Sequence, residues 1–203
     1  SKGFAIAVTE HAAVDALGVY HKNMITAADG SCIPGFSRLA GVLHQNGCRC
    51  LLQLDHGGGW DLQALRGCLD PEKNPDGHSP ADELDDCVLD GIVESFGKAA
   101  RRAEQAGYDG VQIKGCHVFL LGMLFSPLTN HRQAGRYSGQ TFEGRSRMIL
   151  ETMRCIRASV GKDFIVAARI AVQDYFPGGS TVEEAARLAQ ELGLAGADLI
   201  DLS

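Results

Sequence analysis

Apolar residues gather in short runs along the chain, and longer stretches of mixed polar and apolar residues separate these runs. Runs of four to eight residues that are rich in Val, Ile and Leu are typical of parallel strands buried on both faces. The pattern predicts five strands, at residues 4–9, 50–55, 110–114, 164–170 and 197–202.

The stretches between the runs have the three- to four-residue periodicity of amphipathic helices. Pro34 suits the first turn of one of them, and Ser180 with Glu183 three residues later resembles a capping box at the start of another. Each of these stretches ends at a glycine, the usual helix-stopping residue. The periodicity predicts four helices, at residues 34–47, 84–107, 148–161 and 180–193.

Strands that alternate with helices predict right-handed βαβ units, which build either a closed (β/α)8 barrel or an open doubly wound sheet. An open nucleotide-binding sheet usually has a glycine-rich turn after its first strand, whereas Glu10 and His11 stand there in this chain. In a barrel the chemistry lies where the strands end, at their carboxyl face. Polar residues that close apolar strands are therefore the candidates for a site.

Four strands end in such polar residues. They are Glu10 and His11, then Gln53 with Asp55 and His56, then Lys114 with His117, and Arg169. Each also has a structural interpretation: a strand-end residue often satisfies a turn, and Arg169 is equally suited to an ion pair with Glu10 or Asp201. Lys114 is the most informative, because a lysine inside an apolar strand is rare unless it is paired or functional.

Composition narrows the class of protein. With 203 residues, 45% of them hydrophobic and 22% charged, residues 1–203 suffice for a single domain. The formal net charge of -6 disfavours nucleic-acid partners, and no run is long enough to span a membrane. Seven scattered cysteines without the spacing of a metal site predict free thiols in a cytoplasmic protein. We expect a small-molecule substrate, and a homo-oligomer is compatible with this composition.

The stretch AGYDGVQIKGCHVFLLGMLFSPLTNHRQAGRYSGQTFEGRSR, at residues 106–147, strongly resembles the old yellow enzyme family of NADH:flavin oxidoreductases. The segments VTEH, LLQLDHGG, FGKAARRAEQAG and AARI agree with it. The spacing of six residues is specific to that family: Asn130, Arg132, Tyr137, Gly139, Glu143 and Arg145. The resemblance implies an α/β fold, a (β/α)8 TIM barrel that holds FMN at its carboxyl face. It also implies a truncated barrel, from about strand 2 to strand 6, without the loops that bind the FMN phosphate.

The resemblance also implies roles for the strand-end residues. Gln53 and Arg169 match residues that bind the flavin ring, and Glu10 and His11 stand beside it. Lys114 and His117 match the usual pair that binds an electron-withdrawing oxygen of the substrate. The implied reaction is reduction of an activated C=C bond in an enone, enoate or thioester, with FMN as cofactor and NADH or NADPH as reductant.

Three residues depart from the family pattern. The family commonly has a tyrosine proton donor where this chain has Phe119, and a phenyl ring cannot donate a proton. Protonation would then come from water or from another residue such as Tyr175. Lys114 replaces the usual histidine and suits an acidic or thioester carbonyl as well as an enone, while His11 replaces a small residue.

Two other functions remain open from the sequence. A lysine at the end of a barrel strand is also where a Schiff-base aldolase keeps its nucleophile, so Lys114 is compatible with lyase chemistry. A catalytically degenerate barrel, kept for interaction, is the second alternative.

Overall fold

A computed structural model describes residues 3–67, 70, 72–75 and 78–203 of the chain. It contains one parallel sheet with the strand order β2-β1-β3-β4-β5-β6. The strands are β1 Ile6–Ala13, β2 Ile25–Thr26, β3 Arg49–Asp55, β4 Gly110–Gly115, β5 Ile165–Ile170 and β6 Leu199–Leu202. Cys68 lies outside the described residues, and the six described cysteines are free thiols, as expected.

The strand order decides between the two predicted architectures. From β1 to β6 the major strands lie beside one another in chain order, with no reversal of direction around the first strand. A doubly wound sheet would show such a reversal, whereas a barrel adds each new strand to the same edge. The fold is therefore that of part of a (β/α)8 barrel, as predicted.

Two features of the sheet differ from the prediction. The first strand does not end at Thr9 but continues through Ala13, because Ala12 and Ala13 still pair with Leu54 and Asp55 of β3. The polar residues Glu10 and His11 interrupt the apolar run without ending the strand. The sheet also has a sixth strand, β2, which pairs with the end of β1. A strand of two residues has no hydrophobic period that would reveal it.

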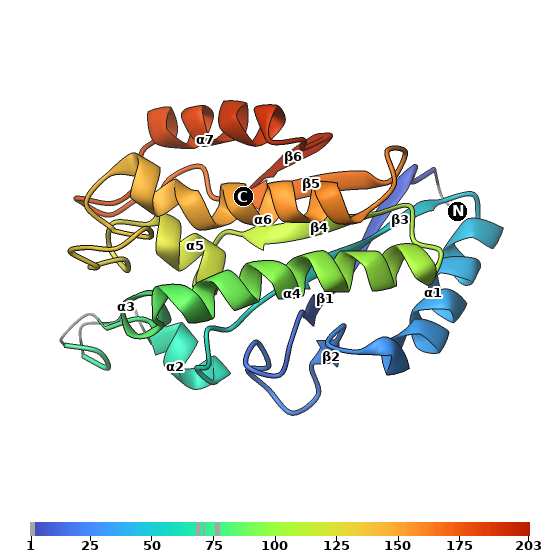
Figure 1. Cartoon of the computed structure of the whole chain (residues 1–203), viewed down its shortest axis with the longest axis horizontal. Coiled ribbons are helices and arrows are strands. Elements are labelled where there is room, and N and C mark those ends of the chain that lie inside the picture. The colour runs from blue at the N-terminus through green and yellow to red at the C-terminus, as the bar shows by residue number, and fades with distance from the viewer. Residues whose placement is uncertain (1–2, 68–69, 71, 76–77) are drawn as a thin grey trace.

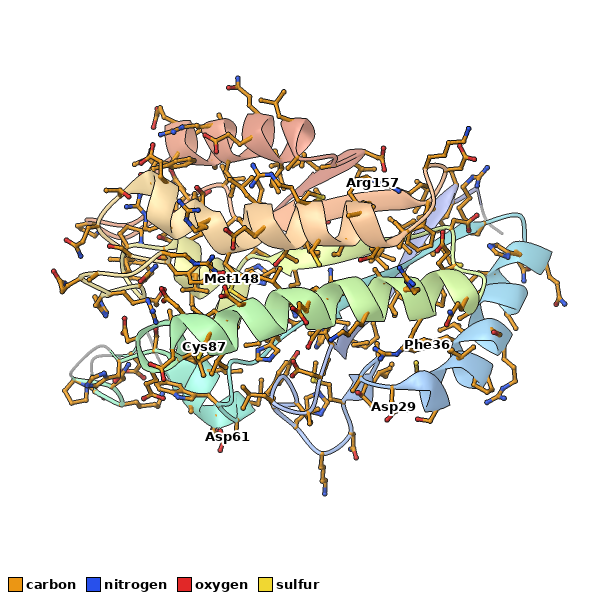
Figure 2. The ribbon with its side chains drawn as sticks, viewed as in Figure 1. Asp29, Phe36, Asp61, Cys87, Met148 and Arg157 are labelled. Carbon is orange, nitrogen blue, oxygen red and sulfur yellow. The ribbon has the colours of Figure 1, made fainter. Side chains whose placement is uncertain are left out.

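Helices connect the strands and cover the sheet (Figure 1). Their bounds are η1 Gly30–Cys32, α1 Ile33–Gln45, α2 Leu62–Gly67, α3 Pro80–Glu83, α4 Asp86–Gln105, α5 Leu120–Phe125, α6 Phe142–Ser159 and α7 Val182–Leu194. The long helices α4 and α6 run side by side in front of the sheet (Figure 1). Phe36 of α1 and Met148 of α6 are buried in the shared core (Figure 2).

The helix starts show where the sequence interpretation was inaccurate. The capping box of α7 is formed by Thr181 and Glu184, one residue later than the predicted Ser180 and Glu183. Helix α6 begins at Phe142, six residues before the predicted start, because its first turns are polar and Thr141 caps them. The short helices α2, α3 and α5 were not predicted, since fewer than two turns give too little periodicity.

Candidate active site

Two layers of polar side chains lie at the carboxyl ends of the central strands. In the lower layer Gln53 of β3 is in register with Gln112 of β4. The Nε2 of Gln53 donates a hydrogen bond of 2.6 Å to the Oε1 of Gln112, and both side chains are buried. The Nε2 of Gln112 donates in turn to the Oδ2 of Asp201 on β6, at 3.2 Å. This bond connects the amide layer to the layer above it.

The upper layer is a row of four charged residues, one from each neighbouring strand. Lys114 of β4 is in register with Arg169 of β5, and Arg169 with Asp201 of β6. Asp55 of β3 directly follows the pair Leu54 and Ile113, so it continues the row on the other side. Lys114 Nζ lies 3.3 Å from Asp55 Oδ2, and Arg169 Nη1 lies 3.6 Å from Asp201 Oδ2. Each cation therefore faces a carboxylate from the strand beside it.

Lys114 is the most enclosed of these cations. Its side chain is 9% exposed, and its ammonium lies 3.5 Å from the centroid of the Phe119 ring. The Nδ1 of His11 is 3.4 Å from the same nitrogen. An ammonium with a carboxylate, an imidazole nitrogen and an aromatic face around it is held in one place. The predicted oxygen donor is thus part of a defined cluster.

Asp55 is fixed by two further donors. The hydroxyl of Tyr20 donates to its Oδ2 at 3.0 Å, and the backbone N–H of His56 donates to its Oδ1 at 2.7 Å. Asp55 is 1% exposed. Burial and the Asp55 carboxylate raise the pKa of Tyr20, so this phenol stays protonated at neutral pH. Tyr20 therefore acts on Asp55 as a hydrogen-bond donor.

His56 holds the loop after β3 rather than facing the site. Its Nδ1 accepts the N–H of Gly58 at 2.9 Å, and its Nε2 lies 3.1 Å from Asp15 Oδ1. Both ring nitrogens are used within the loop, and the residue is 1% exposed. The structure thus supports the interpretation of His56 as a loop histidine.

Glu10 and His11 lie in an irregularity of β1. The register of β1 on β3 shifts between Thr9 and Ala12, so two residues of β1 face one residue of β3 there. Such a bulge re-aims side chains and is common beside active sites. The bulge brings His11 against Lys114, whereas Glu10 is exposed and its Oε1 lies 2.6 Å from His11 Nδ1.

His11 closes one side of the Lys114 cluster. Its ring lies 5.8 Å from the ring of Tyr20 and 6.0 Å from that of Phe119, between centroids. Burial and the nearby ammonium of Lys114 lower the pKa of His11. The imidazole is therefore neutral at pH 7.

His117 lies on the other side of the charged row. Its backbone has a φ of 59°, a left-handed conformation that is uncommon for a residue with a side chain. Its Nε2 lies 2.9 Å from the Oγ of Ser203, to which Arg169 Nη2 also donates at 3.3 Å. Burial, with Lys114 and Arg169 nearby, lowers the pKa of His117, so its ring is neutral at pH 7.

A cavity of about 320 Å³ opens beside His117. Tyr175, on the loop after β5, lines this cavity and has a φ of 61°. Non-glycine residues in the left-handed region concentrate at binding and catalytic sites. The other lining residues are Val118, Ser126, Thr129, Ala171, Gln173, Asp174 and Ser203.

The donor set at the strand ends fits the ring of a flavin. Among the described residues, the Nε of Arg169 is buried without a hydrogen-bond partner. Gln53 uses only its Nε2 within the described chain, in the bond to Gln112. A buried donor without a partner is costly unless a ligand completes it. Guanidinium and amide groups suit the carbonyl and N–H edge of a pyrimidine-like ring.

A second cluster lies at the opposite ends of the strands. His44 Nε2 is 2.7 Å from Asp109 Oδ2, and Cys50 Sγ is 3.6 Å from His44 Nε2. Together they are the one group of possible metal-ligand side chains found in the described part of the chain. The backbone N–H of Cys50 and the guanidinium of Arg49 also bind the Asp109 carboxylate. Asp109 thereby ties the start of β3 to the loop before β4.

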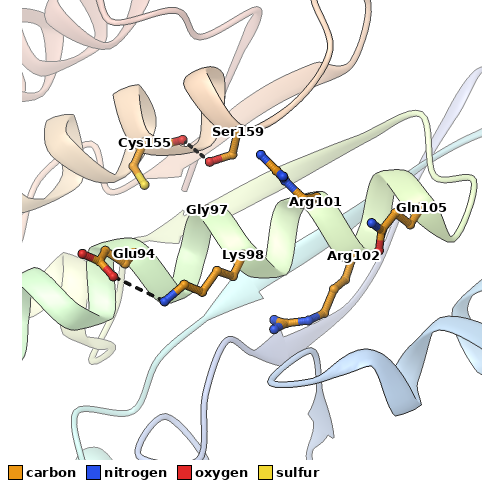
Figure 3. Close-up of a pocket in the computed structure, with 8 residues that line it drawn as sticks. All are labelled: Glu94, Gly97, Lys98, Arg101, Arg102, Gln105, Cys155 and Ser159. Carbon is orange, nitrogen blue, oxygen red and sulfur yellow. Dashed lines mark hydrogen bonds and ion pairs between the residues drawn. The ribbon is translucent and has the colours of Figure 1, made fainter.

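Another hollow also lies away from the strand ends. A groove of about 480 Å³ lies between α4 and α6 (Figure 3). Gly97 lets the two helices approach closely, because a Cβ there would lie 2.8 Å from Cys155 Sγ and from Ser159 Oγ. The groove thus lies along the contact of two packed helices, outside the site at the strand ends. Its other lining residues are Glu94, Lys98, Arg101, Arg102 and Gln105.

The structure brings the predicted residues into two adjoining groups. Lys114 and His11 are in contact above the bond between Gln53 and Gln112. Arg169 and His117 both contact Ser203. The sequence interpretation did not include Tyr20, Gln112 and Ser203 among the candidates. Only Gln112 has a sequence signal: it is a polar residue two positions before Lys114, on the same face of an apolar strand.

The sequence profile of the NADH:flavin oxidoreductase / NADH oxidase family matches residues 1–203, which is the whole chain. The chain belongs to this family. A metal reductase of Desulforamulus reducens is 32% identical to it over 206 residues, which cover 99% of this chain. The name of the family describes flavin oxidoreductases that use NADH.

Solved structures agree with the fold. A 2-naphthoyl-CoA reductase in complex with 2-naphthoyl-CoA matches 99% of the chain with a TM-score of 0.84 and 22% identity. The old yellow enzyme of Trypanosoma cruzi matches 96% of it, with a TM-score of 0.77 and 22% identity. The chain spans 30% of the metal reductase, 33% of the naphthoyl-CoA reductase chain and 60% of the T. cruzi chain. Within the described residues, no helix has the length and apolar character of a transmembrane segment.

Proposed function

We propose that this family member is an FMN-dependent NAD(P)H oxidoreductase that reduces an activated C=C bond of an enone, enoate or thioester. The observation that carries this proposal is the two-layered arrangement toward the carboxyl ends of β3, β4 and β5. Lys114 and Arg169 are in register in the upper layer, and Gln53 is bonded to Gln112 in the lower layer. The buried Nε of Arg169, without a partner in the described chain, supports a ligand at this place.

Each group has a role that its chemistry supports. Gln53 and Arg169 would hold FMN, with Glu10 and His11 beside it. When bound, FMN supplies the hydride that it has taken from NADH or NADPH. Lys114 and His117 would donate hydrogen bonds to the substrate's carbonyl oxygen, which polarises the C=C bond and stabilises the negative charge that develops on that oxygen. Water or Tyr175 would provide the proton that Phe119 cannot.

A substitution pair tests these roles in the FMN-loaded protein. Lys114→Met should leave the flavin content near normal and lower turnover of cyclohex-2-enone, because charge stabilisation of about 2 to 4 kcal/mol is lost, or roughly 30- to 1,000-fold in rate. Gln53→Leu should weaken flavin affinity and shift the flavin potential. Absorbance of the bound flavin and steady-state kinetics measure both.

Several results would contradict this assignment. Exchanged phenotypes of the two variants would show that the roles are misassigned. A colourless protein that takes up no FMN would overturn the function, and FMN binding without oxidation of NADH or NADPH by any acceptor would indicate the degenerate barrel. Trapping of a carbonyl substrate on Lys114 by borohydride would indicate the aldolase, although a Schiff-base nucleophile must be an uncharged amine and Lys114 lies in an ion pair with Asp55.

A further inference from the structure

The ammonium of Lys114 is not a free positive charge. Asp55 Oδ2 lies 3.3 Å from its Nζ, and the side chains are 1% and 9% exposed, respectively. Asp55 has no role of its own in the proposed reaction. A buried carboxylate at the end of a strand is costly to maintain unless it is paired, and its pairing here is with the residue that would bind the substrate's oxygen.

Asp55 is also unable to turn away from Lys114. Tyr20 donates to the same oxygen that faces Lys114, and the backbone N–H of His56 holds the other oxygen. The Tyr20 ring is fixed in turn, since it is 4% exposed and lies 5.2 Å from the Phe119 ring. The negative charge therefore stays beside the ammonium when a ligand enters.

The described residues of β1, β5 and β6 beside Lys114 add no unpaired cation to the site. On β5 and β6, Arg169 faces Asp201. On β1, burial and Lys114 lower the pKa of His11, so its ring is neutral at pH 7, and Glu10 beside it adds no cation. Among the described residues of the site, the formal charges of the row Asp55, Lys114, Arg169 and Asp201 sum to zero. A bound anion would therefore meet no net attraction there.

An anion and a neutral carbonyl respond differently to this pair. A carboxylate that accepts a hydrogen bond from Lys114 also lies within a few ångströms of Asp55, so attraction and repulsion are of similar size in a poorly solvated site. A neutral carbonyl oxygen accepts the same hydrogen bond without that repulsion. It has only to replace the contact between the ammonium and the Phe119 ring.

We propose that Asp55 is a specificity-determining residue, which makes the Lys114 donor select uncharged carbonyl groups and reject carboxylates. Tyr20 is the positioning residue that keeps Asp55 in place. The inference rests on the proposed function, because it takes Lys114 as the group that binds the substrate's oxygen. A free lysine would suit carboxylates, thioesters and enones alike. Asp55 excludes the carboxylates, so the expected substrates are ketones, esters, amides and thioesters.

The test compares two unreactive ligands of nearly equal shape, benzamide and benzoate, by calorimetric titration of the FMN-loaded protein. The wild type should bind benzamide at least about tenfold more tightly than benzoate. Asp55→Asn should bind benzoate at least about tenfold more tightly than the wild type does. Asp163→Asn makes the same chemical change in an exposed loop at the other end of the sheet, and it should behave as the wild type.

A gain of benzoate affinity is a readout that a damaged site does not produce. Equal affinity of the wild type for the two ligands would overturn the inference, as would a folded Asp55→Asn protein with no gain for benzoate. Should Asp55→Asn fail to fold, the wild-type comparison decides alone, and Tyr20→Phe should show a smaller gain for benzoate. The titration requires no turnover, so it reports on the charge preference alone. Failure of the proposed reductase function has a different sign, which is missing FMN or missing oxidation of NADH or NADPH.

Discussion

Lys114 shows how the neighbours of a residue determine its chemistry. On sequence alone it is a lysine in an apolar strand, which suits an oxygen donor and is also compatible with a nucleophile. In the structure its ammonium contacts a carboxylate, an imidazole and an aromatic ring. These contacts favour a fixed, charged hydrogen-bond donor over a nucleophilic amine.

Phe119 offers a test of proton supply at the same place. Phe119→Tyr keeps the ring against Lys114 and adds a hydroxyl, so we expect kcat for cyclohex-2-enone to rise by about tenfold or more if protonation of carbon limits the wild type. Phe119→Leu is the matched control without a donor, and it should show no rise. Steady-state kinetics in H2O and D2O measure the effect. Similar kcat values for the two variants would show that the missing phenol does not limit the reaction.

His11 makes the stability of the protein depend on pH. Burial and Lys114 lower its pKa below the ordinary value of 6.5, so the unfolded chain binds a proton at a higher pH than the folded protein does. The free energy of unfolding should therefore fall as the pH drops below about 6.5, by at most about 1.4 kcal/mol per pH unit from this group.

Urea unfolding at pH 7.5 and 5.5 measures this dependence. His11→Gln removes the titrating ring, and its free energy of unfolding should fall less over the same interval than that of the wild type. An equal fall in the two proteins would assign the pH dependence to other groups.

At the scale of elements, the sequence predicted the five longer strands and four main helices because their periodic patterns extend over several residues. Short elements lack such patterns, and β2 and α3 were missed for this reason. The continuation of β1 past Glu10 and His11 depends on pairing with β3, a long-range contact that local sequence does not record. The position of the α7 cap was missed by one residue, since Ser180 and Thr181 are both good caps.

The same distinction applies to the site. Gln53, Lys114 and Arg169 were predictable because each is a polar residue in an apolar strand, at an end that a barrel brings together. Tyr20 is in a loop with no periodic context, and its bond to Asp55 joins residues 35 positions apart. The family resemblance supplied the expected roles of these positions. The sequence also offered Asp201 as a partner of Arg169, whereas the pairing of Lys114 with Asp55 was found only in the structure.

At the scale of the whole molecule, the two edges of the sheet carry exposed apolar side chains. Phe4 is 71% exposed, and Ile6 and Val8 of β1 are 38% and 44% exposed. At the other edge Leu199 and Leu202 of β6 are 38% and 61% exposed. Strand edges with apolar side chains pair readily with other chains.

We therefore expect the 203-residue chain, prepared alone, to self-associate. Sedimentation velocity at several concentrations should show a weight-average mass that rises with concentration. Leu202→Lys places a charge on the exposed β6 edge and should reduce this rise, whereas Lys162→Leu, on an exposed loop, should not. A monomer at all concentrations would show that the edges are protected.

The charged row also affects how a ligand reaches the site. Two cations at its centre are flanked by two aspartates and the charges sum to zero, so the electric field of the row fades over a much shorter range than that of a lone ion. Incoming molecules receive no long-range guidance from it. Discrimination between ligands is thus confined to the final few ångströms of approach, after water has been displaced.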